Sequence, residues 1–375
     1  MIIGKKDLIA VLAIVAISTS LINMFKSPSQ ASKLSVSTNY TPRMSLALKD
    51  NTLIKPFESW NRSKHAFPCV PENSPETMGI YYIKIPKTSS WSLGQITNRI
   101  AAQEALRQGF ENGKYCKTHD PLVEHPCIHM NCGARDKMKS FLWTIIRHPN
   151  ERAISHYGMH IGFGNWTGSE NEFINKLQTN IFFRPNTQIW WMASENIEAP
   201  ENKEKDISIN VKDVLEQYNF IGIFERLHES IVVLSMLIGV NIHDVLLKFR
   251  PSSVLSRGCT YTTTWKQASW LTPNMTSYMK TPQWRKKQEG DFMLYDMVSK
   301  KLDRTIELLG KEKVRKNLEI YNRLMFIGSD LSSKAYRKGC GVIFDTPYSN
   351  IDDLQNFKQL PEDDVQFVLN SKKIN

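Results

Sequence analysis

Apolar residues in the middle of the chain recur with the periods of strands and helices. Ile80–Ile85 and Ser140–Ile146 are apolar along most of their length, which is typical of parallel strands covered on both faces. Phe220–Phe224 predicts a third, shorter strand. A helical apolar stripe follows each strand, and Phe292–Leu309 carries a further one. This alternation predicts a three-layer α/β fold with a central parallel sheet.

The N-terminus has a different pattern, in which two lysines precede an apolar run at 8–25. A helix of this length spans roughly 27 Å, which suits the thinner membranes of the early secretory pathway. A cleaved signal peptide is the alternative, because small residues follow the apolar stretch Leu8–Ile17. Apolar residues resume at Leu21, which favours an uncleaved anchor with a cytoplasmic tail at 1–7 and the rest of the chain in the lumen.

Two boundaries follow from the remaining pattern. Residues 26–76 are rich in Ser, Thr, Asn, Pro and Lys and lack sustained periodicity, which indicates a luminal stem. The patterned region predicts a folded domain at 77–330, and the weakly patterned remainder predicts a C-terminal extension at 331–375.

The composition agrees with a luminal protein. A net charge of +11 suggests an anionic ligand or an acidic partner surface, or only a generally basic enzyme. Glycosylation sequons begin at Asn39, Asn61, Asn165 and Asn274, and the six cysteines permit disulfides. No paired CxxC occurs, and the spacing Cys127-x4-Cys132 around His129 does not match a usual metal-binding motif. We therefore expect no bound metal.

The turn after the first predicted strand carries the first candidate chemistry. Pro86 ends the strand, Lys87-Thr88-Ser89-Ser90 makes a polar turn, and an apolar stripe from Trp91 begins a helix. Backbone N–H groups at a helix start favour an anion, and an ammonium and hydroxyls add donors. The sequence therefore predicts a phosphate site in this turn.

A second cation ends the next predicted strand. Arg147 follows this strand, Pro149 begins the helix after it, and Ser155 lies on that helix. Ligands of open α/β sheets bind at the carboxyl ends of the strands, so Arg147 and Ser155 are candidates for a second phosphate. Taken alone, an arginine in this position is more often an ion-pair partner.

Together the two motifs resemble the 5′- and 3′-phosphate-binding elements of the membrane-bound carbohydrate sulfotransferases. The galactose 3-O-sulfotransferases and uronosyl 2-O-sulfotransferases are the most similar group, and the resemblance spans roughly Ile80 to Leu309. It implies a P-loop-like fold and transfer of a sulfuryl group from 3′-phosphoadenosine 5′-phosphosulfate (PAPS) to a hydroxyl of a glycolipid, glycoprotein or polysaccharide. It also implies a single-pass type II protein of the Golgi membrane, with 77–330 as the catalytic domain and no nucleic-acid partner.

The resemblance also implies roles for individual residues. Lys87 binds the 5′-phosphosulfate and stabilises the charge that develops on the bridging oxygen. The other residues expected to bind PAPS are Thr88, Ser89, Ser90, Ser92, Arg147 and Ser155. Trp91 departs from the family pattern, which has a small hydroxyl residue at this position. Its indole is better explained as a core anchor for the helix than as a ligand contact.

The reaction needs a base for the attacking hydroxyl, and histidine suits because its ordinary pKa lies near neutrality. The family is expected to place its catalytic histidine in the loop before the second strand, which selects His129. The competing candidates are His119, His125, His148, His156, His160 and Glu124. For the acceptor, we expect Arg152 and Arg184 to bind the glycan. Further cleft-lining candidates are Asn186, Gln188, Trp190 and Trp191, and the basic run at 280–287 is a candidate nucleotide cover.

Three other functions compete with this one. A P-loop kinase shares the strand, turn and helix, but the turn lacks the glycines of GxxxxGK[ST]. A luminal glycosyltransferase fits the anchor and stem, but no Asp-x-Asp motif occurs. A glycan-binding protein with a decayed sulfotransferase site is supported only by the hydroxyl lost at Trp91.

Overall fold

The structure is a computed structural model that describes residues 55–60, 79–107, 135–162, 168–179, 183–193, 207–247, 270–336 and 362–371. All of these residues belong to one compact unit, Asn51–Asn375. The predicted tail and anchor, the six cysteines and three of the four sequons lie outside the described residues. No helix among the described residues is long and apolar enough to cross a membrane.

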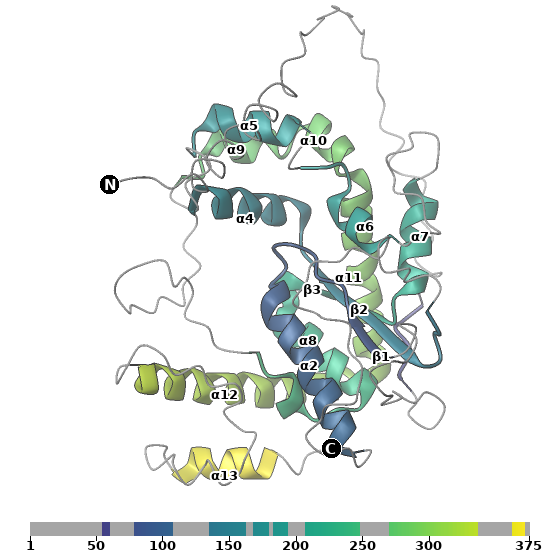
Figure 1. The fold of residues 1–375 in the computed structure, drawn as a ribbon, viewed down its shortest axis with the longest axis vertical. Coiled ribbons are helices and arrows are strands. Elements are labelled where there is room, and N and C mark those ends of the chain that lie inside the picture. Colours follow the sequence, from purple (N-terminus) through teal and green to yellow (C-terminus); the bar gives the residue numbers. More distant parts are fainter. Residues whose placement is uncertain are drawn as a thin grey trace, which may run out of the picture. The chain divides into compact units, whose positions relative to one another are not determined.

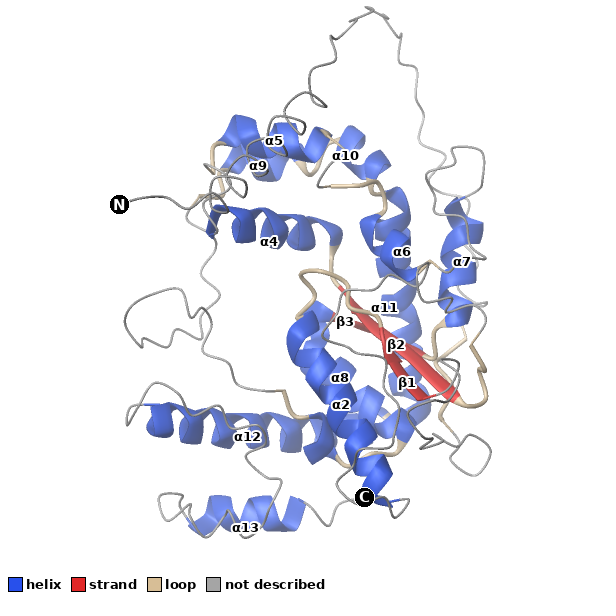
Figure 2. Cartoon of the chain, in the orientation of Figure 1, coloured by secondary structure: helices blue, strands red, loops and turns tan. Residues whose placement is uncertain are grey.

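A parallel sheet of three strands lies at the centre of this unit, in the order β1-β2-β3 (Figures 1 and 2). The strands are β1 (Gly79–Tyr82), β2 (Ser140–Ile146) and β3 (Phe220–Ile223). Every strand residue is buried, as expected for a parallel sheet covered on both faces. The structure therefore confirms a mixed α/β fold and all three predicted strands. β1 ends at Tyr82 rather than at Ile85, although Ile83 N still donates to Trp143 O.

Helices make up most of the rest of the described chain (Figure 2). Before β3 they are α2 (Ser90–Arg107), α4 (Pro149–Gly162), α5 (Glu170–Gln178), α6 (Thr187–Met192) and α7 (Ile207–Gln217). After β3 they are α8 (Leu227–Ile238), α9 (Pro273–Tyr278), α10 (Pro282–Lys287), α11 (Glu289–Leu309), α12 (Lys311–Tyr336) and α13 (Glu362–Ser371). Two short 3-10 helices are η3 (Phe224–Arg226) and η4 (Ile242–Val245). α2 packs on β1, and both α8 and α11 pack on β3.

Residues 55–60, within the predicted stem, pack on the folded core. Phe57 is 1% exposed and lies edge-on to Phe220 of β3, with ring centroids 5.1 Å apart. Trp60 packs in the same way against Phe141 of β2. Phe57 N also donates to Thr305 Oγ1 of α11. These two aromatic residues stand in a polar stretch without periodicity, which is why the sequence did not reveal them.

The predicted C-terminal boundary at 330/331 falls inside α12. Two contacts bind α13 to the body: Arg323 Nη2 lies 3.2 Å from Asp364 Oδ1, and His243 Nε2 lies 3.0 Å from Ser371 Oγ. Ser371 is 1% exposed. At least part of the predicted extension therefore packs on the folded domain.

A smaller hydrophobic cluster joins α4, α5, α9 and α10. Tyr157 of α4 lies edge-on to Phe173 of α5, and Trp284 of α10 donates its indole N–H to Asn150 Oδ1 at 2.8 Å. This cluster packs α4 against α5, α9 and α10. We call the side of α4 that carries Arg152, His156 and His160 its inner face.

Candidate phosphate-binding site

The turn between β1 and α2 is built from residues in an unusual backbone conformation. Lys87 has a φ of 72° and Ser89 a φ of 62°, both in the left-handed region that disfavours any residue other than glycine. Strained residues of this kind gather at ligand-binding turns. The nucleotide kinases place glycines in such a turn, whereas this chain uses a lysine and a serine.

Local hydrogen bonds hold the turn in place. Thr88 is fully buried and its hydroxyl donates to Ile85 O at 2.8 Å. Ser89 O accepts from Ser92 N and Leu93 N, which starts α2 directly after the turn. The side chains of Ser89, Ser90 and Ser92 are partly exposed. Of the four predicted hydroxyl donors, Thr88 therefore supports the turn from inside, and the three serines lie where a ligand can reach them.

Arg147 at the end of β2 meets this turn. Its Nη1 donates to Lys87 O at 3.3 Å, and its guanidinium carbon lies 4.4 Å from the centre of the Phe224 ring. Its Nη2 lies 3.8 Å from Glu151 Oε2. Arg147 is 7% exposed, and burial lowers its pKa although Glu151 and Glu225 oppose the shift. The structure thus brings together the two motifs that the sequence places 60 residues apart.

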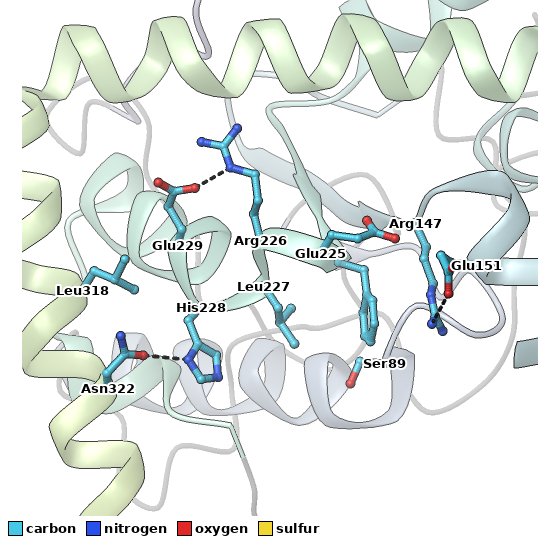
Figure 3. Close-up of a pocket in the computed structure, with 11 residues that line it drawn as sticks. Ser89, Arg147, Glu151, Glu225, Arg226, Leu227, His228, Glu229, Leu318 and Asn322 are labelled. Atoms are coloured by element: carbon cyan, nitrogen blue, oxygen red, sulfur yellow. Dashed lines mark hydrogen bonds and ion pairs between the residues drawn. The ribbon is translucent and has the colours of Figure 1, made fainter. Parts of the chain in front are cut away.

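A pocket of about 670 Å³ opens beside Arg147 (Figure 3). It lies at the carboxyl ends of β2 and β3, and α8 and α12 close its other side. Its lining residues are Ser89, Arg147, Glu151, Phe224, Glu225, Arg226, Leu227, His228, Glu229, Leu318 and Asn322. Arg226 bonds to Glu229 at 2.5 Å and to Asp303 at 2.6 Å, which offsets part of the acidic charge. Glu225 accepts from His148 N and from the Tyr295 hydroxyl.

The inner face of α4 adds a second group of side chains near the turn. Arg152 is 1% exposed, and burial lowers its pKa against the opposing effect of Asp291. His156 and His160 lie one helical turn apart, with their Nε2 atoms 3.2 Å from each other. Burial lowers the pKa of His156 to about 3, assisted by Arg152, His160 and Lys87. Burial, Lys176 and Lys87 also lower the pKa of His160.

With this lowered pKa, His156 is neutral at pH 7. Two rings that share an Nε2–Nε2 contact need one donor and one acceptor, so the pair holds a single proton between them. His156 and His160 have the HxxxH spacing that is typical of metal ligands on a helix, which weakens the sequence argument against a metal. Among the described residues, no group of three or more His, Cys, Asp or Glu side chains is arranged to hold a metal ion.

The remaining predicted site residues divide into three groups. Ser155 is partly exposed on α4, three residues after Arg152. Arg184 is exposed, with its guanidinium carbon 4.4 Å from the centre of the Trp190 ring. His129, its competitors His119 and His125, and Glu124 lie outside the described residues. Trp91 lies in the first turn of α2, and its side chain is outside the described part of the structure.

Two predicted cleft residues are instead buried supports. Gln188 is fully buried and bonds to the backbone of Arg147, and Asn186 is 3% exposed and bonds to the start of α11. Lys287 caps the end of α5, because its Nζ donates to Leu177 O at 2.6 Å and to Thr179 O at 2.9 Å. Burial lowers the pKa of Lys287 to about 8. The sequence suggested contact with ligand for all three, but their polar atoms satisfy backbone groups of the protein.

No family model matches the chain, and neither the curated proteins nor the solved structures yielded a significant match. The resemblance to the sulfotransferases therefore rests on the two sequence motifs alone.

Proposed function

We propose that this protein transfers a sulfuryl group from PAPS to a hydroxyl of a glycan that contains galactose or uronic acid. The main support is the contact between Arg147 Nη1 and Lys87 O, which joins cations from two separate strand ends. PAPS carries phosphate groups on the 5′ and 3′ positions of one ribose. Two cationic motifs at the carboxyl edge of one parallel sheet suit a donor of this kind.

The size and the apolar lining of the pocket agree with a nucleotide, whereas Glu151, Glu225 and Glu229 add negative charge to it and Lys87 is not among its lining residues. Its volume of about 670 Å³ lies in the usual range for ligand sites, roughly 300–1,000 Å³. Phe224 and Leu227 provide apolar surface, and Ser89 and Arg147 provide polar groups at one end. We propose accordingly that the sheet is the core of a P-loop-like three-layer fold.

The chemistry requires an acceptor hydroxyl to attack sulfur as the bond from sulfur to the bridging oxygen breaks. Lys87 would offset the negative charge on that oxygen, and Arg147 with Ser155 would hold the second phosphate. His129 would accept the proton of the hydroxyl, and the exposed Arg184 would bind the glycan. Arg152, the other predicted glycan ligand, is 1% exposed and would support the site from inside. Adenosine 3′,5′-bisphosphate and the sulfate ester are then the two products. None of these steps calls for a metal ion.

The predicted anchor at 8–25 and the sequons support a position in the Golgi membrane, with the catalytic domain in the lumen. Only the fourth sequon lies among the described residues. Its Asn274 is exposed near the start of α9, and the side-chain amide donates to Glu170 Oε1 at 3.0 Å.

Calorimetric titration of the full chain in detergent tests the donor. Adenosine 3′,5′-bisphosphate should bind in buffer that contains EDTA, and ATP with Mg²⁺ should bind more weakly. A preference for ATP that depends on Mg²⁺ would indicate a kinase and contradict the proposal.

The proposed base can be separated from donor binding by His129→Ala. This variant should bind adenosine 3′,5′-bisphosphate as well as the wild type does. It should lose sulfuryl transfer by on the order of 100-fold or more, the usual contribution of a general base. Transfer close to that of the wild type would move the role of base to another residue.

A further inference from the structure

The side-chain amide of Gln188 holds the backbone of Arg147 at both of its polar groups. Arg147 N donates to Gln188 Oε1 at 2.8 Å, and Gln188 Nε2 donates to Arg147 O at 2.9 Å. Gln188 is 0% exposed, so water does not compete for either bond. The two residues are 41 positions apart in the sequence.

This pair of hydrogen bonds between Gln188 and Arg147, which we call the clasp, lies where the pairing of β2 with β3 ends. The last pair of residues between β2 and β3 is Ile146 with Ile223, so Arg147 is the first residue beyond the paired part of β2. A buried backbone N–H and C=O need partners wherever a strand pairing ends. The Gln188 amide supplies one acceptor and one donor, as the next residue of a neighbouring strand would.

The backbone of Gln188 is fixed in turn, because it lies in the first turn of α6 and this turn bonds to the first turn of α11. Its backbone N–H donates to both carboxylate oxygens of Asp291 at 3.0 Å, and Ile189 N donates to Asp291 Oδ1 at 3.0 Å. In return, Asn186 Oδ1 accepts from Gly290 N at 2.8 Å and from Asp291 N at 3.2 Å. Each helix, α6 and α11, thus caps the other, as acceptors at helix starts do.

The close approach of the two helices explains a glycine at residue 290. A Cβ atom on Gly290 would lie 2.7 Å from Ile189 Cδ1 and 3.0 Å from Asn186 Cγ. A side chain at this position would therefore crowd Ile189 and Asn186, the residues that hold the two helix starts together. The interlock fixes the Gln188 backbone, and its amide then fixes Arg147.

We propose that Gln188 is a positioning residue that sets the place of Arg147 for the second phosphate of the donor. This inference rests on the proposed function, in which the Arg147 guanidinium binds that phosphate. Only an amide of this length provides both the acceptor and the donor that the clasp uses. A glutamate lacks the donor and a methionine lacks both.

The test compares two ligands that differ by one phosphate, adenosine 3′,5′-bisphosphate and adenosine 5′-phosphate. The wild-type full chain should prefer the bisphosphate by roughly 10- to 100-fold, the usual value of charged hydrogen bonds. Gln188→Met, of similar volume, should reduce this preference to less than about threefold, because misplacement of a binding group by about 1 Å removes most of its effect.

Gln288→Met is the matched control. Gln288 is also a buried glutamine next to α11, 1% exposed, and its Nε2 donates to Arg184 O at 2.8 Å rather than to Arg147. The control should destabilise the protein to a similar extent and keep the preference for the bisphosphate. If Gln188→Met does not fold, Asp291→Asn weakens the support of Gln188 at nearly constant volume and should reduce the preference several-fold.

The outcomes separate the two proposals. A wild type with equal affinity for both nucleotides would overturn the proposed function and this inference together. A wild type that prefers the bisphosphate, with Gln188→Met or Asp291→Asn retaining the same ratio as Gln288→Met, would overturn this inference alone. If Gln188→Met loses the preference for the bisphosphate over the monophosphate and Gln288→Met keeps it, the positioning role of Gln188 is supported.

Discussion

The candidate site has two phosphate-binding groups, the turn at Lys87 (the first grip) and Arg147 (the second grip). They are held in place by different means. Lys87 lies in a turn fixed by near neighbours, since Thr88 bonds to Ile85 and Ser89 bonds to Ser92. Arg147 is fixed by Gln188, which is fixed by Asp291, at sequence separations of 41 and 103. The first grip carries its own backbone strain, whereas the second depends on the packing of α6 against α11. Local sequence therefore encodes one grip, and tertiary structure completes the other.

The largest effects should come from removing the cations themselves. Lys87→Ala should weaken binding of both adenosine 3′,5′-bisphosphate and adenosine 5′-phosphate by on the order of 100-fold, because it removes the partner of the shared 5′-phosphate. Arg147→Ala should weaken only the bisphosphate, to about the affinity of the monophosphate. Calorimetry with both nucleotides measures the two losses.

Lys311→Ala serves as the control for lost positive charge, since Lys311 is exposed and pairs with Glu307 on the surface at 3.0 Å. It should leave both affinities within about twofold of the wild type. If Arg147→Ala reduced the affinity for both nucleotides equally, Lys87 and Arg147 would not bind separate phosphates.

An effect of intermediate size is expected on the stability of the fold at acid pH, and it involves His156 on α4. Burial, with Arg152, His160 and Lys87, lowers the pKa of His156 to about 3 from its ordinary 6.5. The unfolded chain therefore binds this proton more readily, and the folded state loses stability as pH falls from 6.5 toward 3. His156→Gln should lose less free energy of unfolding between pH 7 and pH 4.5 than the wild type does.

The positive charges that bear on the pair are Lys87, Arg152 and, from α5, Lys176. His228→Gln is the control, because His228 lies on α8 and bonds to Asn322 Oδ1 at 2.7 Å, apart from these charges. Denaturant titrations at the two pH values measure the slopes. An acid slope in His156→Gln as steep as in the wild type would show that the histidine is not held neutral by this cluster.

The smallest expected effect is a difference in stability that measures the backbone strain at Ser89. Ser89→Gly and Ser89→Ala both remove the hydroxyl, but only glycine accepts a φ of 62° without steric cost. The glycine variant should be more stable than the alanine variant by about 1 kcal/mol in denaturant titrations. Equal stability would mean that the turn relaxes to ordinary backbone angles, and the first grip would then not be strained.

The sequence predicted the parts of the molecule that depend on local patterns. Ser140–Ile146 is β2 as predicted, and the helix predicted from Phe292 begins three residues earlier, at Glu289. The turn at Lys87 and the arginine after β2 were found from residue types and spacing. Their meeting at the sheet edge follows from parallel strands, whose carboxyl ends lie side by side.

The supports of the site could not be predicted in the same way. Gln188 and Asn186 stand in a polar stretch, where a ligand contact and a buried backbone contact give the same sequence pattern. Only the packing of α6 against α11 distinguishes them. Phe57 and Trp60 are similar, because nothing near them in the sequence indicates that they reach the sheet. For His156 and His160 the sequence does carry a signal, because the HxxxH spacing places both side chains on one face of a helix.

Transfer of labelled sulfate from PAPS is the most direct test of the central claim. The full chain in detergent is incubated with labelled PAPS and a panel of galactosides, uronic-acid polymers and glycolipids in the presence of EDTA. We expect label in at least one glycan and none with Lys87→Ala. Binding of adenosine 3′,5′-bisphosphate without transfer to any glycan would contradict the account and indicate a glycan-binding protein with a decayed site.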